Sequence, residues 1–402
     1  MSSPTRALAA FGLLAVEFVF MQGLDASRAL AQPMQVAHKR YAAGSKPNGH
    51  WVLSAKPLLS IGGAADGAAR LETITSVLIL ENRQVAVGLM SAAEIRVFDS
   101  TGRFVRQMGK KGRGPGEFPV LWQVYRARDS IVGVDQSGIA QIFDASGRFV
   151  RSAPRASAFG RRTEIAGFFS DGSILGHYYP DPLERAPIGE SLINTMLVRA
   201  VGSSADSLFR VTVGSVFRPA VGQPTAVAFS ARLQVATFGE RFCLSTSERL
   251  AVSCDAKDGA RVLDIEHPNS QGARITDKDK SRYFEGIDRT NPDPRAASYR
   301  NEVRRTTHFA DVRPQIGRLV PSIANELWVG SFDPAETIPG TLNPSPEDST
   351  RWRIYSATGQ WLGALTLPPR FRLMDVARDW IAGVRRDEAG VERGEIFHVT
   401  RE

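Results

Sequence analysis

Basic side chains gather in six short segments that separate longer hydrophobic stretches of the sequence. Segments 62–74, 109–118, 152–164, 213–224, 302–316 and 368–373 hold thirteen Lys and Arg against six Asp and Glu, a net +7, while the 402-residue chain carries +8. The side chains that we expect to bind a ligand are Lys110, Lys111, Arg113, Arg161, Arg162, Arg218, Arg313, Arg370 and Arg372. Guanidinium and ammonium groups around a concave site attract carboxylates, phosphates and sulfated sugars. The sequence therefore indicates an anion-binding surface, provided that the fold brings these segments together.

Signatures of catalysis are weaker than the basic segments. The six histidines show neither H-x-H nor H-E-x-x-H spacing, and G-x-S-x-G is absent, which excludes a zinc site on one helix and a nucleophile elbow. A divalent metal in a channel would need carboxylate and amide ligands from several strands, and the candidates are Glu72, Gln123, Glu164, Gln234 and Asp375.

His177 lies in an aromatic loop that would line a pocket or simply end a strand. The glycine-rich run 109–117 lacks the P-loop pattern and fits a connection between strands. We expect no cofactor.

Internal repeats indicate which elements carry these residues. The segment IRVFDSTGRFVR at 95–106 recurs as QIFDASGRFVR at 141–151, with an offset of 45 residues between Gly102 and Gly147. A third copy lies at 352–362 and a divergent one at 252–262. Each copy reads as two β-strands around a D-x-x-G-type turn, where glycine supplies the positive φ. Two further strands precede each hairpin, and four strands in every ~45–60 residues are typical of a propeller blade.

The fold class that follows is all-β, a six-bladed β-propeller of four-stranded antiparallel blades over residues 51–402. Three C-terminal strands within 371–400 lack a fourth, which we expect residues 51–61 to supply because that closure covers an open sheet edge. Five or seven blades also fit the spacing. Two helix-start signals within 266–305 predict a small helical insertion between blades 4 and 5, either on the surface or as a cap over one face.

The first 31 residues predict a secretory signal peptide. Arg6 precedes the apolar stretch 7–21, and Ala29-Leu30-Ala31 offers a cleavage site, although Glu17 leaves an uncleaved anchor or an amphipathic helix as alternatives. We expect an exported protein, periplasmic or extracellular, with a linker over 32–50 and no transmembrane span after cleavage. Export permits a disulfide between Cys243 and Cys254, which flank a predicted hairpin; two buried free thiols are the alternative.

The two hairpins at 95–106 and 141–151, with the loop GKKGRGPGEF at 109–118 between them, are similar to NHL-repeat propellers. More broadly, the chain resembles the secreted bacterial six-bladed propellers of the TolB-like group, whose closing hairpin looks like residues 383–392, GVRRDEAGVE. The resemblance is strong over 75–155, fair over 310–400 and faint over 160–300. It implies a fold and leaves the activity open, because such propellers include binding scaffolds, lactonase-like hydrolases and lyases.

Together these patterns predict an exported, monomeric binding or interaction propeller without catalytic activity. The connections between blades would emerge on one face and place the basic side chains in a ring around the channel mouth. An anionic small molecule, a glycan or a protein partner fits such a ring, whereas export disfavours nucleic acid. The alternative is a metal-dependent hydrolase or lyase of the lactonase-like kind, with its site in the central channel.

Overall fold

The computed structural model describes residues 36–42, 44–63, 71, 73–153, 163–181, 185–202, 204–267, 272–290, 293–332, 351–387 and 391–402. The predicted signal peptide at 1–31 lies outside these residues, as do Glu72, Arg161 and Arg162. Within the described ranges, no helix is long and apolar enough to cross a membrane.

Blades 1 to 3 are antiparallel sheets whose strands follow the chain from the inner edge to the outer edge. Blade 1 contains β4 (Ile74–Ile79), β5 (Val85–Leu89), β6 (Glu94–Phe98) and β7 (Phe104–Met108). Blade 2 contains β8 (Leu121–Ala127), β9 (Ser130–Asp135), β10 (Ala140–Phe143) and β11 (Phe149–Ala153). Blade 3 contains β12 (Glu164–Phe168), β13 (Ile174–Tyr178), the long hairpin strands β14 (Gly189–Val201) and β15 (Ser204–Arg218), and the short β16 (Thr225–Ala226).

Blades 4 to 6 repeat this order, with additions from the N-terminus. Blade 4 contains β17 (Gln234–Phe238), β18 (Arg241–Ser245), β19 (Ala251–Ala256) and β20 (Arg261–Glu266). Blade 5 contains β21 (Ile316–Pro321), β22 (Glu326–Ser331), β23 (Arg351–Ser356) and β24 (Trp361–Thr366). Blade 6 contains β25 (Phe371–Ala377), β26 (Trp380–Arg386) and β27 (Glu392–Arg401).

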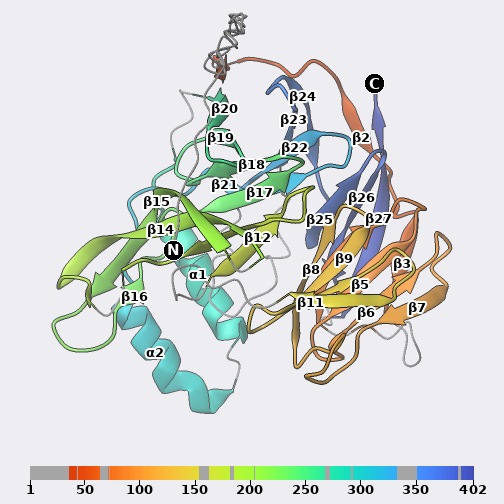
Figure 1. The fold of residues 1–402 in the computed structure, drawn as a ribbon. Helices are drawn as coiled ribbons and strands as arrows, with labels where there is room; N and C mark the ends of the chain where they lie inside the picture. The colour runs from red at the N-terminus through yellow and green to blue at the C-terminus, as the bar shows by residue number, and fades with distance from the viewer. Residues whose placement is uncertain are drawn as a thin grey trace, which may run out of the picture. The chain divides into compact units, whose positions relative to one another are not determined.

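The inner strands close into a ring. Each of β4, β8, β12, β17, β21 and β25 contacts the inner strand of the blade before it and of the blade after it, and β25 contacts β4 (Figure 1). The hydrophobic core lies between the blades: for example, Val77 and Val87 of blade 1 share a buried cluster with Ala382 and Ile396 of blade 6. The predicted six-bladed propeller of four-stranded antiparallel blades is confirmed.

The repeated D-x-x-G turns form as their sequence predicts. In blade 1, Asp99 Oδ1 accepts hydrogen bonds from the backbone N–H groups of Thr101 (2.9 Å) and Arg103 (3.0 Å), and Gly102 has φ +84°. Asp144 and Gly147 repeat the arrangement in blade 2, where Gly147 has φ +90°. The carboxylate thus satisfies turn amides, and glycine adopts the left-handed conformation without a Cβ penalty.

N-terminal residues occupy the outer edge of blade 6. Strands β2 (Trp51–Leu53) and β3 (Leu59–Ile61) both pair antiparallel with β27. Trp51 packs on Gly363 of β24, where a Cβ atom would lie only 2.0 Å from the indole. The segment therefore covers the sheet edge and joins the chain's two ends in one blade.

The predicted linker over 32–50 contains a strand that the sequence did not reveal. β1 (Ala37–Arg40) pairs parallel with β20 at the outer edge of blade 4. Its four residues are all exposed, so it has neither an apolar run nor an alternating pattern. Besides the backbone ladder, His38 Nδ1 lies 3.3 Å from Asp264 Oδ2 of β20, and Arg40 donates to Glu266 Oε2 of β20 at 3.0 Å. Tyr41 follows it and donates a hydrogen bond to the Gly359 carbonyl of blade 5 (2.6 Å).

Two helices lie between blades 4 and 5, where the insertion was expected. Helix α1 (Asp277–Thr290) begins with a reciprocal cap, in which Thr276 Oγ1 accepts from Asp279 N and Asp279 Oδ2 accepts from Thr276 N. A 3-10 turn and α2 (Ala297–Thr306) follow. The apolar face of α1 packs against Phe229, which precedes β17, and against Phe309, which precedes β21.

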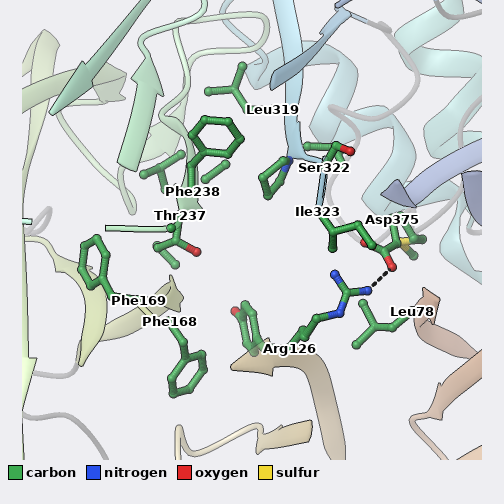
Figure 2. Close-up of a pocket in the computed structure, with 18 of the residues that line it drawn as sticks. Leu78, Arg126, Phe168, Phe169, Thr237, Phe238, Leu319, Ser322, Ile323 and Asp375 are labelled. Carbon is green, nitrogen blue, oxygen red and sulfur yellow. Dashed lines mark hydrogen bonds and ion pairs between the residues drawn. The ribbon is translucent and has the colours of Figure 1, made fainter. Parts of the chain in front are cut away.

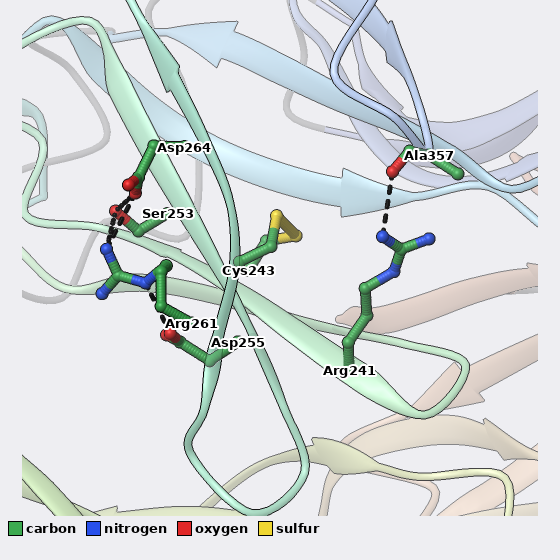
Figure 3. Close-up of a disulfide and its surroundings, with 8 residues drawn as sticks. Arg241, Cys243, Ser253, Asp255, Arg261, Asp264 and Ala357 are labelled. Carbon is green, nitrogen blue, oxygen red and sulfur yellow. Dashed lines mark hydrogen bonds and ion pairs between the residues drawn. A yellow bond between two sulfur atoms is a disulfide. The ribbon is translucent and has the colours of Figure 1, made fainter. Parts of the chain in front are cut away.

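The disulfide lies in the middle of blade 4. Cys243 of β18 and Cys254 of β19 are direct cross-strand partners, and their sulfurs are bonded (Figure 3). Next to the bridge, Arg261 donates to Asp255 Oδ1 (2.5 Å) and to Asp264 Oδ1 (2.8 Å), so ionic contacts reinforce the outer strands of the same blade. Closing a loop of this size contributes about 2–3 kcal/mol to stability.

Candidate functional site in the central channel

Every inner strand runs from the crossover end of the channel, where the chain arrives from the previous blade, to the inner-turn end, where it turns into the second strand. Facing the channel, these strands leave backbone groups without a partner strand. On β4, blade 6 supplies partners for both ends: Glu392 accepts from Ile74 N and Asp375 accepts from Ile79 N, each at 2.7 Å. Buried amides need such acceptors, so these carboxylates close the seam between the first and last blades.

An ion pair between Asp375 and Arg126 completes this seam at the inner-turn end. Arg126 of β8 donates to Asp375 Oδ2 at 2.6 Å and to the Ile79 carbonyl at 2.5 Å (Figure 2). The Asp375 side chain is only 7% exposed and the Arg126 side chain 24%. One carboxylate and one guanidinium therefore bracket the end of β4 and tie blades 6, 1 and 2 together.

A cavity of about 440 Å³ occupies the channel and reaches the inner-turn end. All six inner strands contribute to its wall, together with turn residues such as Arg128, Ser170 and Ser322. Figure 2 shows Phe168, Thr237 and Ser322 around this space, with the Arg126–Asp375 pair at one side. A concave site of this size, lined by both apolar side chains and polar groups, suits a small ligand.

The charged groups that line the cavity are three arginines and one aspartate, which leaves a net +2. Asp375 is engaged by Arg126. Arg318 of β21 is partly buried, and its guanidinium contacts the Met374 sulfur at 3.8 Å; no described carboxylate forms an ion pair with it. Because a partly buried cation without an anion is costly, Arg318 is poised to bind an acidic group.

The crossover end of the channel carries an exposed tryptophan. Trp122 of β8 is the extra residue of a bulge between Leu121 and Gln123, and 56% of its surface is exposed. The side-chain amide of the neighbouring Gln123 lies 2.8 Å from the Tyr125 hydroxyl. Bulges in inner strands redirect side chains, and this one releases a large aromatic group from the space between blades.

Next to it, blade 3 presents a carboxylate and an imidazole. Glu164 begins β12, and its Oε2 lies 3.9 Å from Nε2 of His177, its cross-strand partner. The Thr195 hydroxyl lies 3.4 Å from His177 Nδ1 and 3.0 Å from the Tyr178 carbonyl oxygen. The Glu164 side chain is 59% exposed and the His177 side chain 17%.

The electrostatics of these groups are coupled. Burial lowers the pKa of His177 below its usual value, and the Glu164 carboxylate partly offsets that shift. Burial, with Glu164 adding to it, raises the pKa values of Tyr125 and Tyr179. Perturbed titratable groups that meet at the mouth of a channel are typical of binding or catalytic sites.

The predicted basic ring is only partly available for a ligand. Lys110 pairs with Glu117 at 3.3 Å, and Arg313 pairs with Asp279 at 2.9 Å. The other described members are Arg218, which donates to the Ala186 carbonyl, Arg372, which donates to the Ile74 carbonyl, the partly buried Arg370, and the exposed Lys111 and Arg113. None of these residues lines the cavity. The ring around the crossover end stays a prediction.

The candidate metal ligands do not gather in one place. Gln123, Gln234 and Asp375 line the cavity, whereas Glu164 faces His177. Asp375 already accepts two hydrogen bonds, one of them from a guanidinium that would compete with a cation. Across the described residues, no group of three or more His, Cys, Asp and Glu side chains is arranged to hold a metal ion.

The sequence interpretation missed Trp122, Arg126, Arg318 and the pairing of Glu164 with His177. The hint for the first two was present, since the predicted inner strand from 120 to 126 carries bulky polar and aromatic residues at consecutive positions. A strand packed between two neighbours rarely tolerates such residues unless they face a channel.

Comparisons with known proteins agree with this fold. Residues 68–140 match the model of a family described as 6-bladed beta-propeller. A search of curated proteins finds no match. A member of the DUF4221 family from Bacteroides vulgatus is similar in structure at 10% identity, covering 88% of this chain and 99% of its own, with a TM-score of 0.52. A Bacteroides fragilis protein described as exported covers 92% of this chain and 100% of its own, at 11% identity and a TM-score of 0.47.

Proposed function

We propose that this protein is an exported binding propeller that takes up a small anionic ligand in the channel cavity. The observation that carries the proposal is Arg318, a partly buried guanidinium in the cavity wall that has no carboxylate partner among the described residues. The net +2 of the lining favours an anion over a neutral molecule. The cavity volume of about 440 Å³ limits the ligand to a small molecule.

Export is supported by the sequence of residues 1–31 and by the disulfide in blade 4. A binding role is favoured over a metal-dependent reaction because the acidic residue of the cavity, Asp375, serves the seam between blades. The arginines that remain supply charge and hydrogen-bond donors, which select a ligand without transferring a proton.

Calorimetric titration with citrate, inorganic phosphate and galacturonate tests the proposal. Loss of a charged hydrogen bond costs about 1.5–3 kcal/mol, so R318M should weaken binding of the preferred anion by roughly 10- to 150-fold. R318K should lose less affinity for the anion than R318M does, because the ammonium keeps the positive charge. It should still bind more weakly than the wild type, because it lacks the planar fork of donors.

The chain offers a matched control for the cavity arginines. Arg128 and Arg378 both follow an alanine and precede an aspartate in an inner turn, with φ values of +50° and +53°, but only Arg128 lines the cavity. R128A should therefore weaken anion binding, and R378A should leave it unchanged. The proposal is wrong if none of the three anions binds, or if R318M binds them as well as the wild type does.

The basic ring at the crossover end makes a competing prediction. If it binds the anion instead, charge reversal of Lys110, Lys111, Arg161 and Arg162 should abolish retention on an anionic matrix and anion binding in solution. Under the cavity proposal, the same quadruple variant retains calorimetric binding, and R318M loses it.

A further inference from the structure

Trp122 differs from the other five tryptophans in its exposure. Trp51, Trp328, Trp352 and Trp380 are each less than 9% exposed, Trp361 is partly buried, and Trp122 is 56% exposed. Both faces of blade 2 are covered, by blades 1 and 3, so an exposed side chain on its inner strand faces the channel or the channel mouth. An indole in that position offers a flat apolar surface to a ligand.

The neighbouring blade presents two hydrogen-bond acceptors toward each other. The single proton of the Thr195 hydroxyl is donated to the Tyr178 carbonyl at 3.0 Å. We therefore assign the ring proton of neutral His177 to Nδ1, which lies 3.4 Å from the same hydroxyl oxygen. In the neutral imidazole, Nε2 then carries a lone pair and faces the Glu164 carboxylate at 3.9 Å. Burial favours the neutral imidazole. Two facing acceptors call for a donor from outside.

The aromatic surface and the acceptors lie at the same end of adjacent inner strands. Trp122 is the second residue of β8, and Glu164 is the first residue of β12. The strands are joined by a hydrogen bond of 2.8 Å from the Tyr125 hydroxyl to the Ile165 carbonyl. Tyr179 adds a second exposed ring, whose centroid lies 6.2 Å from that of His177.

We infer that the crossover end of the channel is a saccharide subsite, with Trp122 stacking on the sugar ring and Glu164 and His177 Nε2 accepting hydrogen bonds from its hydroxyls. A pyranose is complementary to this surface. Its apolar face of C–H groups can stack on the indole, and its adjacent hydroxyls can donate hydrogen bonds to the two acceptors. The subsite goes beyond the anion cavity, because none of Trp122, Glu164 and His177 lines that cavity.

Tryptophan emission provides a direct readout, because Trp122 is the most exposed indole. Titration with cellohexaose, chitohexaose and mannohexaose should quench or shift the emission for at least one of the three. In calorimetry, W122A should weaken binding of that oligosaccharide by about tenfold or more, and W122F by less, since a phenyl ring keeps part of the platform. E164Q should weaken it several-fold, because the amide is a poorer acceptor than the carboxylate.

The control separates this subsite from the anion cavity. R318M should keep oligosaccharide binding and lose anion binding, and W122A should do the reverse. The inference is overturned if none of the three oligosaccharides binds, or if W122A and E164Q bind them with wild-type affinity. The last result would mean that water alone bridges Glu164 and His177. Unchanged thermal unfolding of W122A would establish that its folding is intact.

Discussion

Two acid–base pairs that each involve a residue of an inner strand have opposite settings. Asp375 and Arg126, at the inner-turn end, are 2.6 Å apart, and the Asp375 side chain is 7% exposed. Glu164 and His177, at the crossover end, are 3.9 Å apart, and the Glu164 side chain is 59% exposed. The Asp375 carboxylate accepts hydrogen bonds from a guanidinium and a backbone amide. The Glu164 carboxylate instead faces Nε2 of His177, which we assign as an acceptor.

The difference shows what decides whether a polar pair supports the fold or meets a ligand. Breaking a buried pair whose hydrogen bonds are satisfied costs much stability. Removal of one partner leaves the other as an unpaired charge in a medium of low dielectric constant. An exposed pair at longer range contributes little to stability and leaves its capacity for hydrogen bonds open. Each pair combines a carboxylate with a basic side chain. The two roles therefore differ because of burial and because of how many hydrogen bonds each carboxylate already accepts.

The largest expected effect separates the two carboxylates by stability. D375A removes the acceptor of Ile79 N and leaves Arg126 with a buried charge, so it should lower the free energy of unfolding by about 3–5 kcal/mol. E164A, as the matched control, should change it by about 0.5 kcal/mol or less. Urea unfolding followed by far-UV circular dichroism measures both. Equal losses for the two variants would contradict the assigned roles.

A smaller effect is expected in the coupling within each pair. A double-mutant cycle of R126M and D375A should give an interaction energy of about 1–3 kcal/mol, because the two groups share hydrogen bonds in a buried site. The cycle of H177Q and E164Q should give about 0.5 kcal/mol or less. Additive effects at Arg126 and Asp375 would mean that each acts only through the backbone of β4.

The smallest effect concerns the protonation of His177. Its pKa should lie below the ordinary value of about 6.5, and E164Q should lower it further by removing the carboxylate that favours the imidazolium. Tyr179, the other titratable ring against His177, is neutral in this range. The ordinary tyrosine pKa of about 10 already lies above it, and burial raises the pKa of Tyr179 further. Proton NMR titration of the imidazole, assigned with H177Q, measures the change.

The sign of the linked stability follows from that shift. A depressed pKa means that the unfolded chain binds this proton more readily, so the contribution of neutral His177 is present above pH ~6.5 and is lost as the pH falls toward its folded value. E164Q should therefore be more acid-sensitive than the wild type. A rise of the His177 pKa in E164Q would contradict the electrostatic assignment, whereas D375N should leave that pKa unchanged.

Much of the fold was predictable because it is encoded locally. The D-x-x-G turns at Asp99 and Asp144 depend on neighbours within a few residues, and both form as expected. The helical insertion predicted from two local helix-start signals within 266–305 also forms. β1 was missed because its four residues are all exposed and show no apolar pattern, while its partners in β20 lie 226 residues away. The site was harder to predict from the sequence, because Asp375 and Arg126 are 249 residues apart and meet only when the ring closes.

The sequence by itself determined a propeller of four-stranded blades and favoured six of them, because alternation, turn glycines and the 45-residue repeat are local signals. The ring closure in the structure then decided the number of blades. The sequence also identified the excess of arginine. Only the tertiary structure decided which charges are satisfied: Arg313 and Arg372 are engaged within the fold, while Arg318 faces the cavity without a described carboxylate. The physical reason is that a side chain's role depends on its burial and its partners, and strands from different blades supply both.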